Sequence, residues 1–125
     1  MAANSYGNAE IEAVTSIYDG DTFRANIAGW PDIIGQRVPI RINGIDTPEL
    51  RGKCEVEKKL ARQAKQLTVA TLRAGKHIQL NNMQRGKYFR IIADVMVDGK
   101  SLATELVNAG LAVPYHGGTK INWCQ

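Results

Sequence analysis

Two short stretches of the chain combine carboxylates with residues that favour turns: Asp19-Gly-Asp-Thr22 and Asp46-Thr-Pro-Glu49. Each stretch has an ordinary structural explanation when taken alone, because Asp-Gly is a common hairpin turn and Thr-Pro-Glu is typical of a helix start. Together they offer the oxygen ligands that a hard cation such as calcium prefers. Their spacing differs from that of an EF-hand loop, so such a site would be assembled from separate segments.

A cation held between these stretches would suit the hydrolysis of a phosphodiester bond. That reaction needs positive charge to offset the charge that develops on the phosphorane oxygens, and a base that deprotonates the attacking water. Asp21 and Asp46 are candidate carboxylate ligands, the Thr47 carbonyl is a third ligand, and Asp19 is placed to hold a bound water. Glu49 follows across a rigid proline and can face the same cleft without serving as a ligand, as a water-activating base must.

Two arginines are candidates for binding the phosphate in such a reaction. Arg41 lies on the polar face of a predicted strand a few residues before Asp46, and Arg90 begins a later predicted strand after Lys87-Tyr88. A guanidinium group stays charged and donates two parallel hydrogen bonds, which matches the geometry of a phosphate. For either arginine alone, a solvated strand face is the ordinary alternative.

Alternating apolar and polar residues predict the strands that would carry these side chains. In chain order we expect strands at residues 11–18, 23–27 and 38–42, and two more at residues 76–81 and 90–97. Asp19-Gly20 and Asp98-Gly99 mark tight turns beside them.

Two helices are predicted around the last two strands. Between the third and fourth strands, residues 55–74 have the periodicity of a long helix, and Gly75 is placed to end it. The predicted apolar stripe of this helix is Val56, Leu60, Ala64 and Leu67. After the fifth strand we expect a short helix at residues 102–109, with Ser101 as its N-cap. Three strands, a helix and two strands are the order of the OB-fold, a five-stranded Greek-key barrel, here of the α+β class, that commonly binds nucleic acid.

Length and composition fit a single domain spanning residues 1–125. A chain of 125 residues can bury a sizeable core, and its net charge of +4 is compatible with a polyanionic partner. No apolar run approaches the roughly 18 residues of a membrane helix. The first residues lack the basic and apolar parts of an export signal, which leaves either a cytoplasmic protein or a mature secreted one.

Residues 14–115 resemble the staphylococcal nuclease (thermonuclease) family. The matching pieces are Asp19-Gly-Asp-Thr22, Arg41-Ile-Asn-Gly-Ile-Asp-Thr-Pro-Glu49, Lys87-Tyr-Phe-Arg90, Asp98-Gly-Lys100, Glu105-Leu-Val107 and Gly110-Leu-Ala112. The second piece is the most specific, and all the pieces follow the family's order.

This resemblance implies a five-stranded OB barrel with calcium bound beside the barrel wall. It implies a nuclease that cleaves DNA and RNA with little sequence preference, by in-line attack of water that leaves 3′-phosphate ends. By position, the resemblance implies metal ligands at Asp21, Asp46 and the Thr47 carbonyl, with Asp19 in the outer shell. It implies that Glu49 is the general base and that Arg41 and Arg90 are phosphate clamps. It also implies substrate contacts for Lys87, Tyr88 and Tyr115. We expect a monomer with no membrane association.

The sequence departs from the family pattern at several places. Phe89 stands where the family usually has glycine, so the approach to Arg90 is expected to differ in shape. The stretch at residues 29–39 is longer than the usual connection, and the loop at residues 50–54 is shorter. Nothing in the sequence corresponds to the family's long C-terminal helix, and of its two nucleotide-contacting tyrosines only Tyr115 has a counterpart here.

Cys54 and Cys124 are expected to form a disulfide. If Tyr115 lines the same pocket as Glu49, as the resemblance implies, the two cysteines lie near each other in the fold. The bridge would close a loop of about 70 residues and add roughly 4 kcal/mol of stability. A disulfide and a non-specific nuclease both favour a secreted or periplasmic location. Two free thiols in a cytoplasmic protein are the alternative, and a zinc site with only two cysteines is much less favoured.

Other functions remain open at this point. A nuclease-like barrel can serve as a non-catalytic nucleic-acid-binding module, although the acids and arginines present here favour an enzyme. A metal-free ribonuclease using His77 and His116 is a further alternative, but neither histidine has a motif around it. The basic residues of the long helix form either a DNA-binding stripe or, more commonly, a solvated face; they are Lys58, Lys59, Arg62 and Lys65.

Overall fold

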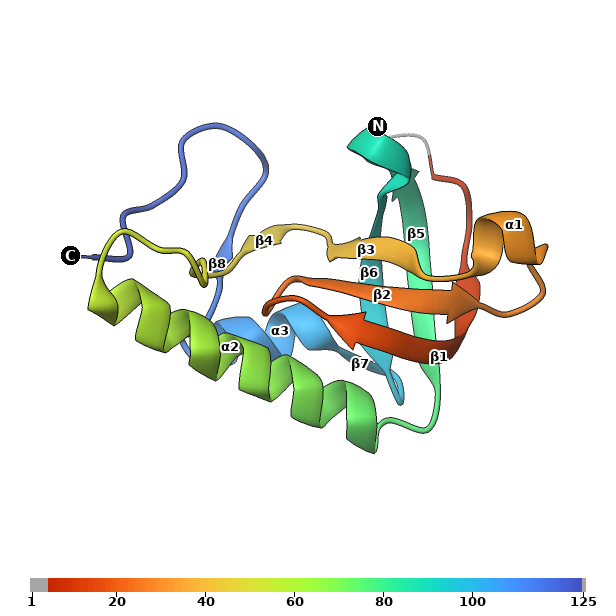
Figure 1. The fold of residues 1–125 in the computed structure, drawn as a ribbon, viewed down its shortest axis with the longest axis horizontal. Coiled ribbons are helices and arrows are strands. Elements are labelled where there is room, and N and C mark those ends of the chain that lie inside the picture. Colours follow the sequence, from red (N-terminus) through yellow and green to blue (C-terminus); the bar gives the residue numbers. More distant parts are fainter. Residues whose placement is uncertain (1–4, 125) are drawn as a thin grey trace.

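The computed structural model describes residues 5–124, and five of its strands close a barrel (Figure 1). The barrel strands are β1 (Ala9–Ile17), β2 (Thr22–Ile27), β3 (Val38–Ile42), β5 (Ile78–Arg85) and β6 (Ile91–Val97). Their order is β3-β2-β1-β5-β6, and a parallel pairing between β3 and β6 closes the sheet on itself. The α+β class and the five-stranded barrel predicted from the sequence are confirmed.

Apolar faces of the strands fill the barrel. β2 and β3 alternate as predicted, with one face buried and the other turned outward. The largest fully buried side chains of the barrel strands are Phe23, Ile40, Ile42, Leu80 and Val95. On the outward face, Thr22 of β2 lies opposite Arg41 of β3 in the antiparallel register. This register brings the end of the β1–β2 turn beside the arginine.

The predicted bounds of three strands need correction. β1 covers Ala9–Ile17 rather than residues 11–18, and β5 continues to Arg85 instead of ending at residue 81. β5 begins at Ile78 rather than at residue 76, because the backbone N–H groups of Lys76 and His77 donate to the carboxylate of Asp98 instead of to a neighbouring strand. β6 begins at Ile91 rather than at Arg90, since the Arg90 N–H donates to the Lys87 carbonyl (3.1 Å) and closes a short 3-10 turn, η1 (Lys87–Phe89).

The long helix α2 (Glu55–Ala74) has the predicted bounds, and it lies along one side of the barrel (Figure 1). Its buried face differs from the predicted stripe. The residues that are buried are Glu57, Ala61, Ala64, Thr68 and Leu72, whereas Val56 is exposed and Leu60 and Leu67 are only half-buried. Within the described residues, no helix is long and apolar enough to cross a membrane.

Small residues let α2 approach the β1–β2 turn closely, which explains the shifted face. The Thr68 hydroxyl donates to the Gly20 carbonyl (2.7 Å). A Cβ added at Gly20 would lie 2.8 Å from the Cβ of Ala64 and 3.1 Å from a methyl group of Thr47. The turn between Asp19 and Asp21 is therefore pressed against the helix.

Short elements complete the fold. α1 (Asp32–Gly35) lies in the long connection between β2 and β3. β4 (Ile45–Asp46) pairs with β8 (Val113–Pro114), and β7 (Lys100–Ser101) pairs with β6. α3 (Leu102–Asn108) is the predicted short helix, and the Ser101 hydroxyl caps it by accepting from Thr104 N–H.

After β8 the chain forms a C-terminal strap, residues 115–124, which arches away from the barrel and returns to the start of α2 (Figure 1). Its first residue is tied to the barrel, because the Tyr115 N–H donates to the Gly44 carbonyl (2.8 Å). Its end is tied to the helix by a disulfide between Cys54 and Cys124, with a Cα–Cα distance of 6.0 Å. The predicted disulfide is confirmed, and the alternative of two free thiols is wrong.

Candidate active site

The turn between β1 and β2 presents two buried carboxylates. Asp19 and Asp21 are each less than a tenth exposed, and the Asp21 N–H donates to the Asp19 carboxylate (3.2 Å). The Thr22 hydroxyl donates to Asp21 (3.0 Å), and the guanidinium of Arg41 lies 3.6 Å from the other oxygen of Asp21. One carboxylate thus faces the arginine of the neighbouring strand.

Burial, followed by the nearby charge of Asp21, raises the pKa of Asp19 from 3.8 to about 7. Desolvation disfavours the charged form of a carboxyl group, and a second carboxylate beside it adds repulsion. A site that crowds carboxylates in this way is relieved by a bound cation or by a proton. The sequence placed Asp19 in the outer shell of the site, and here it lies next to Asp21.

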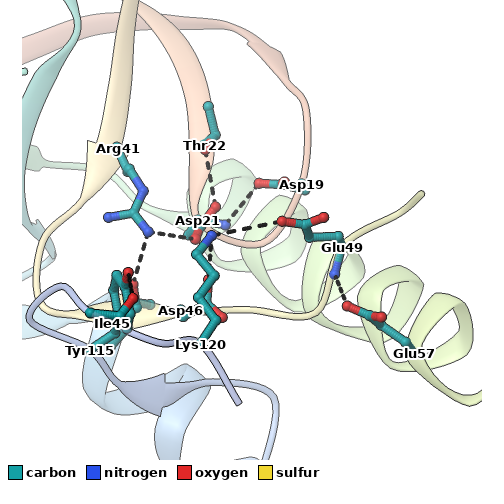
Figure 2. A network of polar contacts seen from close by, with 11 residues as sticks. Asp19, Asp21, Thr22, Arg41, Ile45, Asp46, Glu49, Glu57, Tyr115 and Lys120 are labelled. Atoms are coloured by element: carbon teal, nitrogen blue, oxygen red, sulfur yellow. Dashed lines mark hydrogen bonds and ion pairs between the residues drawn. The ribbon is translucent and has the colours of Figure 1, made fainter. Parts of the chain in front are cut away.

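The second acidic stretch lies across from the turn, on β4 and the loop that follows. Asp46 is buried, and the carbonyl of the preceding Ile45 accepts a hydrogen bond from Arg41 (3.3 Å). Arg41 therefore joins the two acidic stretches, since it contacts Asp21 on one side and the Ile45 carbonyl on the other (Figure 2).

Glu49 is presented differently from the aspartates. Its side chain is 60% exposed, while its backbone N–H donates to the carboxylate of Glu57 (3.2 Å). Glu57 is buried in the first turn of α2 and also accepts from the Lys53 N–H (3.0 Å). The backbone of Glu49 is thereby fixed while its carboxylate stays accessible, which suits a group that meets a water molecule.

Glu57 was missed by reasoning from the sequence, although a signal was present. It lies three residues after Cys54, which caps α2 by accepting from the Glu57 N–H (3.4 Å). A glutamate at this position commonly reaches back to free N–H groups before the helix. The cysteine in place of serine or threonine concealed that pattern.

Lys120 of the strap was also missed, and nothing in the local sequence indicated it. Its ammonium lies 3.3 Å from Asp46 and 3.7 Å from Glu49 (Figure 2). Desolvation acts to lower the pKa of Lys120, but the charges of Asp46 and Glu49 outweigh it, so the pKa is raised above its usual value. Only the path of the strap brings this residue to the acids.

The arrangement suits a hard cation, provided that carbonyl and water oxygens complete the ligand set. Among residues 5–124, no group of three or more His, Cys, Asp or Glu side chains is close enough to hold a metal ion unaided. Calcium accepts six to eight oxygens and commonly takes carbonyls and waters beside carboxylates. Asp21 and Asp46 are buried, and the hydroxyl of Thr47 is buried without a hydrogen-bond partner. Two buried carboxylates and a buried hydroxyl without a partner suit a hard cation, and the Thr47 carbonyl stays a predicted ligand.

The turn at residues 87–90 is exposed, unlike the buried acids. Tyr88 and Phe89 are 91% and 93% exposed, and both have positive φ angles, 58° and 62°. Arg90 lines a surface hollow with Tyr18, Thr22 and Arg24, so it lies near the residue that follows Asp21, but no hydrogen bond or ion pair of the described residues joins its side chain to the acids. Hydrogen bonds and ion pairs of the described residues connect Asp19, Asp21, Arg41, Asp46 and Glu49, through Ile45 and Lys120, but do not reach Lys87, Tyr88 or Arg90.

Tyr115, at the start of the strap, lies beside the acids. Its hydroxyl donates to the Gly118 carbonyl (2.8 Å), and its ring centre is 5.7 Å from the Lys120 ammonium. Lys120 contacts both Tyr115 and Glu49, and it thereby connects the two residues that the resemblance places in one pocket.

The two histidines lie on different segments. The His77 N–H donates to Asp98 just before β5, whereas the imidazole of His116, in the strap, lies close to Gly44. No hydrogen bond or ion pair of the described residues involves either imidazole, and neither joins the network of acids.

The chain belongs to the staphylococcal nuclease family, because residues 39–122 match the family model described as staphylococcal nuclease homologue. This match includes Arg41, Asp46, Glu49 and Arg90, and it ends inside the strap. The resemblance drawn from the sequence motifs is confirmed.

Curated relatives are named as probable endonucleases. A probable endonuclease LCL3 of Podospora anserina is 28% identical over 128 residues, covering 85% of this chain and 46% of the relative. One of Pyrenophora tritici-repentis is 28% identical over 128 residues, covering 85% and 47%. One of Neosartorya fischeri is 29% identical over 129 residues, covering 82% and 43%. The chain spans less than half the length of these relatives.

Proposed function

We propose that this protein is a calcium-dependent nuclease that hydrolyses phosphodiester bonds of DNA and RNA and leaves 3′-phosphate ends. The observation that carries the proposal is the position of Arg41, which joins the two acidic stretches beside an accessible Glu49. A cation, a guanidinium and a carboxylate that solvent can reach are the three groups that phosphodiester hydrolysis requires. The relatives named as probable endonucleases support the same class of reaction.

Each side chain has a defined task in this proposal. Asp21, Asp46 and the Thr47 carbonyl hold the calcium ion, and Asp19 holds one of its waters. Bound calcium supplies positive charge to the oxygens of the reacting phosphate. Glu49 accepts a proton from the attacking water through its exposed carboxylate.

Arg41 and Arg90 donate hydrogen bonds to the phosphate as its negative charge increases. Lys87, Tyr88 and Tyr115 bind the neighbouring phosphate and nucleotide. Arg41 is held by Asp21 and the Ile45 carbonyl, whereas Arg90 is exposed beside Thr22 and has no ion pair among the described residues. The side chain of Arg90 is therefore expected to be ordered by the phosphate when the substrate binds.

Little sequence preference follows from the kind of contact that these residues make. Carboxylates around a cation and guanidinium groups recognise phosphates, which every nucleotide carries, and not the edges of bases. The same groups are indifferent to the 2′-hydroxyl, so both DNA and RNA are proposed substrates. We propose that the chain acts as a monomeric single domain.

A secreted or periplasmic location is part of the proposal. The Cys54–Cys124 disulfide supports it, because such bonds persist mainly in oxidising compartments. Confinement outside the cytoplasm would also protect the nucleic acids of the producing cell.

Digestion of plasmid DNA and total RNA in calcium, in magnesium and in excess chelator tests the function. Cleavage is expected in calcium and is expected to stop in chelator. Glu49→Gln should remain folded and lose roughly 10²–10⁴-fold in turnover, the usual contribution of a positioned base. Glu105→Gln, on the exposed face of α3, is the matched control. Binding of DNA without cleavage would instead identify a non-catalytic binding module, and full activity in chelator would contradict the role of calcium.

A further inference from the structure

We propose that Lys120 sets the affinity of the carboxylate site for its cation, because its ammonium and the metal ion compete for Asp46, while its second contact, with Glu49, helps to hold it there. The Cys54–Cys124 disulfide holds the strap so that Lys120 stays at these acids. This inference rests on the proposed calcium site and adds a residue and a covalent constraint to it.

Contacts of Lys120 place it among the residues that are candidates for metal binding and catalysis. Its ammonium is 3.3 Å from Asp46 Oδ1 and 3.7 Å from Glu49 Oε1, and Asp46 is almost fully buried. A carboxylate oxygen that accepts from an ammonium at this distance has to give up that contact when a cation coordinates it. Metal binding at Asp46 therefore includes the free energy of breaking the Lys120–Asp46 ion pair.

The strap is held at both ends, so Lys120 cannot diffuse away. At one end the Tyr115 N–H donates to Gly44, and at the other the disulfide joins Cys124 to the first turn of α2. The indole nitrogen of Trp123, the residue before Cys124, is buried. Closing a chain in this way raises the effective concentration of Lys120 at the acids.

The size of the expected effect follows from the weakness of half-exposed ion pairs. The side chain of Lys120 is 47% exposed, so each pairing shifts an equilibrium by only a few-fold. When the site is open in only a fraction of the molecules, the apparent affinity for the ligand is the intrinsic affinity multiplied by that fraction. Removing Lys120 should therefore tighten calcium binding roughly three- to tenfold.

Calorimetric titration of the full chain with calcium chloride, without nucleic acid and at fixed ionic strength, tests this. Lys120→Gln should bind calcium roughly three- to tenfold more tightly than the wild type. Lys120→Arg, which keeps the charge, should stay near the wild type. Lys59→Gln, which removes an exposed charge from α2, is the matched control and should change the affinity less than twofold.

The double variant Cys54→Ser/Cys124→Ser tests the part played by the disulfide. Serine at position 54 can still cap α2, and all charges are kept. Releasing the strap should tighten calcium binding by a factor similar to that of Lys120→Gln, and adding Lys120→Gln to the double variant should then change little. Circular dichroism checks that each variant is folded at the temperature of the titration.

Several outcomes would overturn the inference. Equal affinity of Lys120→Gln and Lys59→Gln would refute the competition, as would the absence of calcium binding in both the wild type and Lys120→Gln. Wild-type affinity in the disulfide-free variant would refute the part assigned to the bridge. A nuclease assay separates this inference from the proposed function: calcium-dependent cleavage with no Lys120 effect on affinity leaves only the function standing, whereas the affinity effect without cleavage leaves only the inference.

Discussion

The acidic region and the turn at residues 87–90 lie on the same barrel but are constructed in opposite ways. In the acidic region, Asp21 and Asp46 are buried, and Arg41 contacts Asp21 and the carbonyl of Ile45, the residue before Asp46. In the turn, Tyr88 and Phe89 are almost fully exposed, with backbone angles that bulky residues rarely adopt. The helix α2 and the strap support the first region, whereas the second protrudes from the ends of β5 and β6 (Figure 1).

This difference indicates that the acidic region is organised before substrate binds, whereas the turn is not. Groups that act on the developing charge of a reaction are most effective when they are already fixed, since no reorganisation is then needed. Groups that hold a flexible polymer can be ordered by the substrate, at a cost in affinity. We expect variants in the acidic region to affect turnover and stability, and variants in the turn to affect mainly substrate binding.

Substitution of either arginine has the largest expected effect, and it tests whether the acidic region and the turn both contribute to catalysis. Arg41→Ala should lower turnover roughly 10²–10⁴-fold, because it removes a positioned donor to the phosphate. Arg90→Ala should cost a similar factor if the turn closes on the substrate. Steady-state kinetics on a defined oligonucleotide measures both, with Arg62→Ala on the exposed face of α2 as control.

A small loss for Arg90→Ala, with a large one for Arg41→Ala, would mean that the exposed turn does not take part in the chemistry. A small loss for Arg41→Ala would contradict the proposed site itself.

Gly20→Ala should destabilise the fold by roughly 1–3 kcal/mol, since the added methyl group would overlap Ala64 on α2 and Thr47. Urea unfolding measures the loss. Ala64→Gly removes the clashing methyl group but itself costs about 1 kcal/mol as a helix glycine. The double variant should therefore be more stable than the sum of the single losses predicts. Strict additivity would show that α2 does not press on the turn.

Asp19→Asn should raise the melting temperature of the protein in chelator, on the order of 5 °C at pH 8. The pKa of Asp19 is about 7 in the folded protein and 3.8 ordinarily, so the folded state binds its proton more tightly. Stability from this group is therefore lost as pH rises from about 4 to about 7 and stays lost above 7. The advantage of Asp19→Asn should vanish near pH 4.

Differential scanning calorimetry across this pH range makes the measurement, and Asp32→Asn on the exposed α1 serves as control. If the difference in melting temperature between Asp19→Asn and the wild type does not change with pH, the effect does not come from the ionisation of buried Asp19.

Lys87→Ala should have the smallest effect, and it tests whether the turn contributes to substrate binding rather than to turnover. Loss of one phosphate contact should raise KM a few-fold while kcat stays within about twofold, and stability should change by less than about 0.5 kcal/mol. Lys100→Ala, also exposed, is the control. A large fall in kcat at saturating substrate would place Lys87 with the acidic region instead.

Local patterns in the sequence were enough to predict the barrel strands, the bounds of α2 and the acidic motifs. Alternation in β2 and β3 records which face of each strand is buried, and the Ser101 hydroxyl marks the start of α3 by its own chemistry. The motif from Arg41 to Glu49 is contiguous, so its match to a family needs no knowledge of the fold. The resemblance also indicated the disulfide, through the expected place of Tyr115.

Only the tertiary structure decided which face of α2 is buried and which residues complete the site. Hydrophobicity alone favoured burial of Val56 and Leu60. Close contact of α2 with Gly20 requires small residues on the helix, and this requirement comes from the β1–β2 turn and not from the helix sequence. Lys120 reaches Asp46 because two distant anchors fix the path of the strap between them. The sequence by itself determined the reactive groups and the strands that carry them, whereas contacts between segments far apart in the chain decided how these groups meet.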